Sequence, residues 1–281
     1  MDNVEIDGLK FRAHKGVLKE LVFQGYDLKK ELEALEKYGI VNVCICRYDS
    51  KDRINDLDFL KDYPFIKGVT LSPDDANFNI DGLYSLTNLE RLLAGKHKID
   101  FMAFPHLKVL DTRYPRPCEF PDEIHTLYLW YSKFKGKGLS SVRFPKAIKL
   151  LDITWSDLDD LTGMPSGLEN FTIAYTRKLS SLAGLENSSS SLNRVMLDHC
   201  PNLRDYSSLY ECQNLSSLVI GDCREMPDIG FVNGMKDLRH FVFDGTVVRD
   251  HDLSPLKGLP FVSFTNNKEY NYRLKDFNHV M

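Results

Sequence analysis

The stretch LNRVMLDHC, Leu192–Cys200, contains the pattern that decides the fold of this chain. An aliphatic residue is followed by two variable residues, a second aliphatic, one variable residue and a third aliphatic. The last three of these positions alternate inward, outward and inward, which is the period of a short, half-buried strand. The pattern therefore predicts a strand at Val195–Leu197.

The same pattern recurs along almost the whole chain. The second aliphatic of each of the twelve copies falls at residues 21, 43, 69, 92, 110, 127, 151, 171, 195, 218, 241 and 262. One such unit cannot bury its apolar face alone, whereas neighbours stacked in parallel share a continuous core. The spacing predicts a solenoid of short parallel strands.

The repeated pattern resembles the leucine-rich repeat family, whose signature is L-x-x-L-x-L-x-x-N/C-x-L, from about Leu18 to Asn267. Several middle copies carry a proline before the strand, as in FPHLKVL and MPSGLENF, which is similar to the short repeats of bacterial leucine-rich proteins. The first four copies depart most, since they lack a small polar residue after the strand. The resemblance implies an α/β solenoid, a leucine-rich-repeat horseshoe with about twelve parallel short strands on its concave face. Its convex face would carry 3-10 or short helical turns.

No shift in composition divides the chain, so we expect residues 1–281 to form one leucine-rich-repeat domain. Residues 1–40 are expected to form an N-terminal cap, residues 41–267 the repeats, and residues 268–281 a C-terminal cap or tail. The cap is expected to contain a helix near residues 27–38, with Asp27 as its N-cap and Gly39 as its stop. Leucines at three-residue spacing between the strands predict short 3-10 turns.

Composition and charge limit the kinds of partner and the cellular location that we expect for this protein. The net charge is −4 and no long basic stripe is present, so nucleic acid is not an expected partner. No run of 18 apolar residues and no apolar signal segment at the N-terminus is found, so neither membrane insertion nor secretion is expected. The six cysteines follow no disulfide spacing, and we expect reduced thiols and a cytoplasmic location.

The Asp-His-Cys triplet in the opening stretch suggests a nucleophile or a metal site, but its place in the repeat argues otherwise. Five residues past the second aliphatic, the later copies carry Ser132, Ser156, Thr176, Cys200, Cys223, Thr246 and Asn267. In the family this position turns inward and hydrogen-bonds backbone carbonyls, so Cys200 would point inward and His199 outward. A Cys–His pair must meet to react, and Cys44 and Cys46, which face outward from their strand, lack further ligands nearby. No metal, no cofactor and no catalytic residue is expected.

Two other columns of the repeat are expected to line the concave face, and they are rich in aromatic and acidic residues. Exposed tryptophan, tyrosine and arginine are typical of binding surfaces, but rings on neighbouring strands also pack on one another and stabilise a sheet. Both interpretations remain open at this point. The candidate partner-binding residues are Asp111, Arg113, Tyr114, Tyr128, Trp130, Tyr131, Asp152, Thr154, Trp155, Tyr175, Asp198, His199, Asp222 and Asp244.

These residues favour a non-catalytic protein–protein interaction module, acting as a scaffold or as an inhibitor or immunity-type protein. The acids suggest a basic patch on the partner. The alternative is a carbohydrate- or peptide-binding protein that uses the exposed aromatics. A minor alternative is a hydrolase, since Asp111 and Asp152 would lie two strand spacings apart, about 9–10 Å at the backbone, near a glycosidase separation of about 6.5–9.5 Å.

Overall fold

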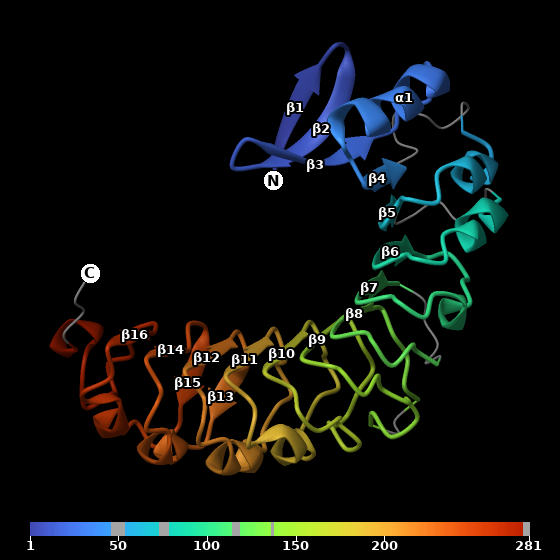
Figure 1. The fold of residues 1–281 in the computed structure, drawn as a ribbon. Coiled ribbons are helices and arrows are strands. Elements are labelled where there is room, and N and C mark those ends of the chain that lie inside the picture. Colours follow the sequence, from blue (N-terminus) through green and yellow to red (C-terminus); the bar gives the residue numbers. More distant parts are fainter. Residues whose placement is uncertain (46–53, 73–78, 114–118, 136–137, 278–281) are drawn as a thin grey trace. The chain divides into compact units, whose positions relative to one another are not determined.

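The computed structural model describes residues 1–45, 54–72, 79–113, 119–135 and 138–277 (Figure 1). The chain divides into two compact units. The first, here called the N-terminal unit, comprises Met1–Tyr114, Glu119–Leu127 and Pro145–Ala147. The second, the C-terminal unit, comprises Pro115–Cys118, Tyr128–Phe144 and Ile148–Met281. Each unit is described by itself, and the single-domain organisation stays a prediction.

The N-terminal unit begins with three antiparallel strands, β1 (Asp2–Ile6), β2 (Leu9–His14) and β3 (Val17–Val22). Strand β3 also starts the parallel series, which continues through β4 (Asn42–Ile45), β5 (Gly68–Leu71), β6 (Arg91–Gly95) and β7 (Val109–Thr112). The second aliphatics of the first five copies lie opposite one another in register and are fully buried: Leu21, Val43, Val69, Leu92 and Leu110. The repeat therefore holds from the first copy, although these copies lack a small polar residue after the strand.

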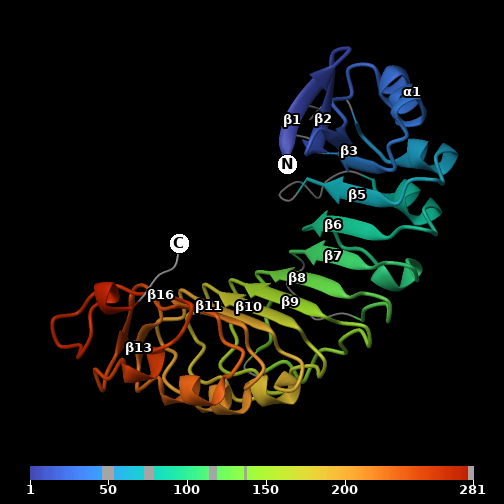
Figure 2. The same ribbon diagram turned by 60° about the vertical axis from the view of Figure 1, so that its left-hand side comes forward.

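Helix α1 (Leu28–Tyr38) lies in the N-terminal unit where the sequence predicts it (Figure 2). The Asp27 carboxylate accepts a hydrogen bond from the backbone N–H of Lys30, which satisfies one of the free donors at the helix start. Gly39 ends the helix in the left-handed conformation with φ of 64°, where a side chain would be strained. The helix buries Leu32 and Leu35 and packs against β3, so the expected capped helix is confirmed.

The C-terminal unit contains the regular part of the solenoid. Its parallel strands are β9 (Leu150–Thr154), β10 (Asn170–Ala174), β11 (Arg194–Asp198), β12 (Ser217–Gly221), β14 (His240–Val242) and β16 (Phe261–Ser263). Strand β8 (Thr126–Trp130) ends in this unit, and β13 (Arg224–Met226) pairs with β15 (Thr246–Val248) in a small second sheet. The second aliphatics again form one buried row: Leu151, Phe171, Val195, Leu218, Phe241 and Val262.

Short 3-10 turns connect the strands, as the leucine spacing predicts. Aspartates before some of these turns accept hydrogen bonds from backbone N–H groups two residues on, as Asp205 does from Ser207 and Asp252 from Ser254. No helix among the described residues is long and apolar enough to cross a membrane. The turns are η1 (Asp58–Asp62), η2 (Asp81–Ser85), η3 (Phe101–Ala103), η4 (Leu185–Ser188), η5 (Ser207–Glu211), η6 (Gly230–Gly234), η7 (Ser254–Leu256) and η8 (Leu274–Asp276).

The small residues after the strands of the C-terminal unit form the expected inward column. The Thr176 hydroxyl lies 3.0 Å from that of Ser156 and donates to the carbonyl of Ala174. The Thr246 hydroxyl accepts from the N–H of Cys223 and donates to the carbonyl of Ile220, both at 3.0 Å. These bonds satisfy buried backbone groups where the chain leaves the sheet, so the structural role assigned to this column is confirmed.

The cysteines of this column are buried free thiols. Cys200 and Cys223 are fully buried, and their thiols donate to the carbonyls of Asp198 and Gly221. A hydrogen bond with Cys200, together with burial, raises the pKa of Cys223 far above its usual range. Burial and this raised pKa disfavour the thiolate form of Cys223, which is the reactive form of a cysteine.

Cys44 occupies the outward row of its strand, but it is fully buried there and not open to solvent. Its neighbours in that row are Val22 on one side and the buried Thr70 on the other, so packing along the row covers the thiol. Cys46 lies outside the described residues.

Candidate functional site

The residue that follows the strand in successive repeats of the C-terminal unit has a left-handed backbone. Tyr131, Trp155, Tyr175, His199 and Asp222 have φ of 56°, 56°, 52°, 50° and 48°. We call these five residues the turn column. Each donates its backbone N–H to a carbonyl at the end of the next strand, at 2.9–3.0 Å. These bonds fix the turn, send the side chain outward and direct the following small residue into the core.

A left-handed backbone is costly for residues other than glycine, at roughly 1–2 kcal/mol each. For bulky side chains it is a marked outlier. The next repeat carries Gly245 at the same position with φ of 68°, and glycine adopts this conformation without steric cost. The protein therefore keeps aromatic rings at positions where glycine would be easier to accommodate, which is a pattern typical of functional sites.

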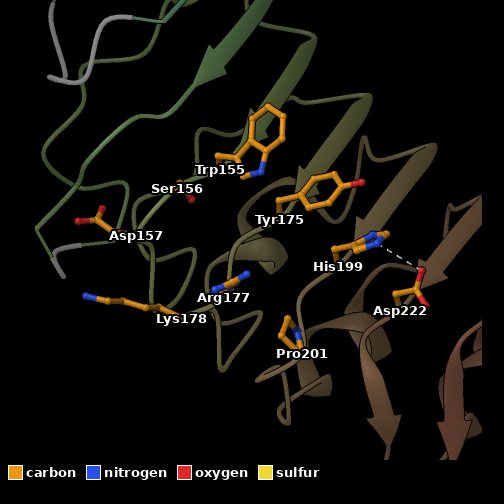
Figure 3. A pocket seen from close by; sticks show the side chains of 9 residues that line it. All are labelled: Trp155, Ser156, Asp157, Tyr175, Arg177, Lys178, His199, Pro201 and Asp222. Carbon is orange, nitrogen blue, oxygen red and sulfur yellow. Dashed lines mark ion pairs between the residues drawn. The ribbon is translucent and has the colours of Figure 1, made fainter.

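Four members of the turn column, Tyr131, Trp155, Tyr175 and His199, are rings that stack on one another in chain order. Figure 3 shows the last three. Ring centroids lie 4.7 Å apart for Tyr131 and Trp155, 5.2 Å for Trp155 and Tyr175, and 4.3 Å for Tyr175 and His199. We call these four rings the aromatic ladder. Trp130, one residue before Tyr131, adds a contact with Trp155 at 5.8 Å.

The stacked rings remain accessible to solvent. Tyr131, Trp155 and Tyr175 are 43%, 41% and 41% exposed. Ring pairs of this kind contribute about 0.5–1.5 kcal/mol each beyond area burial, which is comparable with the cost of one left-handed residue. The stacking energy therefore largely offsets the backbone strain. Little net stabilisation remains to explain why four rings occupy this position.

Because each ring covers its neighbours, the ladder presents mainly ring edges to solvent. The edges carry the positive part of the aromatic quadrupole and the polar Tyr, Trp and His atoms. A sugar or a cation stacks on a ring face, and the faces inside the ladder are occupied. The exposed edges are better suited to hydrogen bonds and edge contacts with a protein surface.

A groove of about 630 Å³ runs beside the ladder. Trp155, Tyr175 and His199 form one wall (Figure 3). The exposed Arg177 and Lys178 also line it. The groove adds Arg177 and Lys178 to the candidate site, which the sequence did not single out because they follow the inward column in the repeat.

Asp152 and Thr154 on β9 are hydrogen-bonded members of the predicted site. Thr154 is buried, and its hydroxyl donates to Oδ1 of the half-buried Asp152 at 2.9 Å. Burial raises the pKa of Asp152 above its ordinary value of 3.8, although the Thr154 hydrogen bond acts in the opposite direction. Asp152 is therefore a partly desolvated acid and not a freely solvated one.

The structure gathers most of the predicted site residues in one place but not all of them. The C-terminal unit holds the candidates from Tyr128 to Asp244 along one outward face of its sheet. Asp111 and Arg113 belong to the N-terminal unit, and Tyr114 lies outside the described residues. The outward face also carries Met196, 40% exposed on β11, which sequence reasoning had not selected.

Neither a protein-family model nor a curated protein matches this chain. Solved structures do match: an internalin, InlF, from Listeria monocytogenes aligns with a TM-score of 0.56 and 17% identity, over 88% of this chain and 76% of that one. The fold is an internalin-like leucine-rich-repeat solenoid. The functional domain of InlJ from Listeria monocytogenes, described as including a cysteine ladder, aligns with a TM-score of 0.50 and 12% identity, over 90% of this chain and 66% of that one.

The resemblance to leucine-rich-repeat proteins is thereby confirmed at the level of fold. Identities of 12% and 17% carry no residue roles from the internalins to this chain. Leucine-rich-repeat folds are usually non-catalytic protein-binding modules, but function has to be argued from the site itself.

Proposed function

We propose that the protein is a non-catalytic binding module that holds a partner protein on the outward face of its C-terminal unit. The binding face consists of the aromatic ladder with Tyr128, Trp130, Asp152, Thr154, Asp198, Asp222 and Asp244. By occupying a surface of its partner, the protein would act as an inhibitor or immunity-type protein.

The observation that carries the proposal is the combination of strain and exposure in the ladder. Rings that only stabilised the sheet would gain most from full burial, yet Tyr131, Trp155 and Tyr175 keep about two fifths of their surface exposed. Tyrosine and tryptophan dominate the energetics of protein interfaces because they bury a large, rigid area. A preformed ladder also loses little conformational entropy on binding.

The acids beside the ladder suggest the charge of the partner. Asp198, Asp222 and Asp244 lie at the ends of successive strands, and the Asp244 carboxylate accepts a hydrogen bond from Ser263. A basic patch on the partner would meet this edge. Such charges increase the association rate more than the affinity, and their effect weakens as salt rises.

The other two functions have less support from the geometry. A saccharide would need open ring faces, and those inside the ladder are occupied by neighbouring rings. For the hydrolase, Asp111 and Asp152 belong to different units, and the Thr154 hydroxyl already donates to Asp152.

The test compares capture of a partner from the native host by the unmodified protein and by two variants. The triple variant Trp130→Ala, Trp155→Ala, Asp152→Ala removes two rings and one acid from the binding face. We expect at least a 30-fold loss of affinity for the captured partner, since hot-spot truncations cost about 2 kcal/mol or more and 1.4 kcal/mol is tenfold.

The matched control is Tyr210→Ala, which removes a 48% exposed ring from turn η5, away from the binding face. Thermal melts of all variants separate loss of binding from loss of folding. Unchanged affinity in a folded triple variant would show that the ladder is only a packing device.

A further inference from the structure

The aromatic ladder ends at His199, whose imidazole lies between two carboxylates. Nδ1 lies 2.9 Å from Oδ1 of Asp198, and Nε2 lies 3.6 Å from Oδ2 of Asp222. Figure 3 shows the His199 ring directed toward Asp222 across the end of the groove. Asp198 closes β11, and Asp222 follows β12 in the next repeat, so the cluster is assembled by stacking of neighbouring repeats.

Two glycines make room for the carboxylates. A Cβ on Gly221 would lie 2.8 Å from the Asp198 carboxylate, and one on Gly245 would lie 2.1 Å from the Asp222 carboxylate. Each aspartate thus lies over a glycine in the following repeat. This space allows both carboxylates to approach the same imidazole.

One atom of the cluster lacks a partner. His199 Nδ1 is buried and has no hydrogen-bond partner among the residues that the structure describes, because its short distance to Asp198 lacks hydrogen-bond geometry. Buried polar atoms are almost always satisfied, and an exception calls for an explanation such as an ion. The left-handed backbone of His199 and Asp222 holds both side chains in this arrangement.

We propose that Asp198, His199 and Asp222 bind a divalent transition-metal ion, with Zn²⁺ as the best-fitting example. Each residue offers one ligand atom, and these atoms lie within 4.8 Å of one another. Zinc bonds of about 2.0–2.2 Å to nitrogen and oxygen place tetrahedral ligands about 3.4 Å apart. The side chains must therefore move closer together to reach that spacing.

The donor set also indicates the kind of ion. One imidazole nitrogen with two carboxylate oxygens suits Zn²⁺ and similar ions, whereas Mg²⁺ prefers oxygen ligands and water. Three protein ligands leave a fourth position for water, which is typical of open sites.

The nearby cations bear on the strength of binding. Arg177 and Lys178 line the same groove, and their charge opposes a bound metal. Figure 3 shows Lys178 at the end of the groove away from Asp222. We therefore expect micromolar affinity and not the tight binding of a closed structural site.

The sequence predicted no metal here, because Cys200 of the Asp-His-Cys triplet turns inward while His199 points outward. The metal-free alternative is an imidazolium paired with both carboxylates. A metal site is recognised by its pH dependence, because the metal binds neutral imidazole and competes with protons. Zinc binding should weaken as pH falls from 7.5 to 5.5.

The experiment is calorimetric titration of the full chain with ZnCl₂ at pH 7.5, with MgCl₂ as a separate titrant. We expect one equivalent of Zn²⁺ with Kd below about 50 μM, a value equivalent to roughly −6 kcal/mol, and much weaker Mg²⁺ binding. His199→Gln and Asp222→Asn should each weaken Zn²⁺ binding at least tenfold.

The matched control is His251→Gln. His251 also has a left-handed backbone, with φ of 60°, and faces one carboxylate, Glu269, at 3.2 Å. The control should bind Zn²⁺ like the unmodified protein. Circular dichroism without metal confirms folding of each variant. Absence of saturable Zn²⁺ binding, equal effects of His199→Gln and His251→Gln, or tighter binding at pH 5.5 would overturn the proposal.

Discussion

The two units make the turn after the strand in different ways. In the described part of the N-terminal unit, glycine takes the left-handed position near the strand end, as Gly25 with φ of 69° and Gly95 with φ of 55°. In the C-terminal unit, rings and acids take it in five successive repeats, and glycine returns only at Gly245. At the described turn positions, the same backbone need is met without steric cost in one unit and at a cost in the other, which supports the binding face proposed for the C-terminal unit.

The units also satisfy their buried polar groups differently. In the C-terminal unit, four successive members of the small inward column, Thr176, Cys200, Cys223 and Thr246, hydrogen-bond backbone groups. In the N-terminal unit, Glu31 of α1 reaches back and accepts from the N–H groups of Gln24 and Gly25 at 2.7–3.1 Å. In the N-terminal unit, side-chain hydrogen bonds from single charged residues thus take the place of the inward column. The stability of this unit should therefore depend on those residues.

The largest effect is expected from Glu20→Ala in the N-terminal unit. The buried Glu20 carboxylate accepts from Arg12 and Thr70, both at 2.8 Å, and lies 3.5 Å from Arg91. Breaking a buried ion pair costs about 3–5 kcal/mol, and we expect the lower end because both arginines are partly exposed. Urea denaturation measures the loss.

The control for this variant is Glu90→Ala, which removes a partly exposed carboxylate bonded to Lys67 and Lys108. Exposed pairs contribute about 0–1 kcal/mol. Similar losses for the two variants would mean that the N-terminal unit does not depend on its buried charge.

The next effect is expected from Thr246→Val, which keeps the side-chain shape but removes a rung of the inward column. The N–H of Cys223 and the carbonyl of Ile220 lose their partner. An unsatisfied buried group costs about 1–3 kcal/mol, so we expect a loss of about 2 kcal/mol by urea denaturation. Thr265→Val, at an exposed position, serves as the control and should change stability little. Equal free energies of unfolding for Thr246→Val and Thr265→Val would contradict a structural role for the inward column.

A smaller difference separates Trp155→Gly from Trp155→Ala. Both variants lose the ring, but only alanine retains the left-handed strain, so the glycine variant should be more stable by about 1 kcal/mol. Both should lose partner binding equally. Thermal melts and affinity measurements on the pair separate the two contributions, and a glycine variant less stable than the alanine variant would argue against strain at this turn.

The smallest effect is expected from Asp152→Asn. The folded-state pKa of Asp152 is raised above its ordinary value of 3.8, so the ionised form costs stability, and that cost develops as pH rises from 3.8 through the raised value. Asparagine should raise Tm at pH 7 by roughly 1–3 °C, a gain that fades as pH falls toward 3.8. The same variant should bind the partner more weakly, a trade-off common at functional sites; a gain independent of pH would exclude this cause.

Much of the fold could be predicted because its information is local. The strand positions follow from the alternation of aliphatic residues, and each second aliphatic, from Leu21 to Val262, is buried where expected. Asp27 and Gly39 carry the chemistry of helix ends by themselves. The inward place of Cys200 follows from its position in the repeat alone, since the neighbouring copies bury Thr176, Cys223 and Thr246 at the same step.

The candidate site could be predicted only as a set of outward columns. The sequence placed Trp155, Tyr175 and His199 on one face, but it did not show whether their rings meet face to face or stay apart. It also gave no sign of the left-handed turn, because aromatic residues rarely adopt it.

The sequence by itself thus determined the repeat, the buried row and the residues available on each face, since periodicity fixes which way a side chain points. Only the tertiary structure decided that the turn column is left-handed, because each turn N–H bonds a carbonyl in the next repeat. Only the tertiary structure decided that Asp222 approaches His199, because two residues 23 positions apart meet through the register of β11 and β12. The contacts of the candidate site lie between repeats, and the sequence pattern does not give the distances between residues of different repeats.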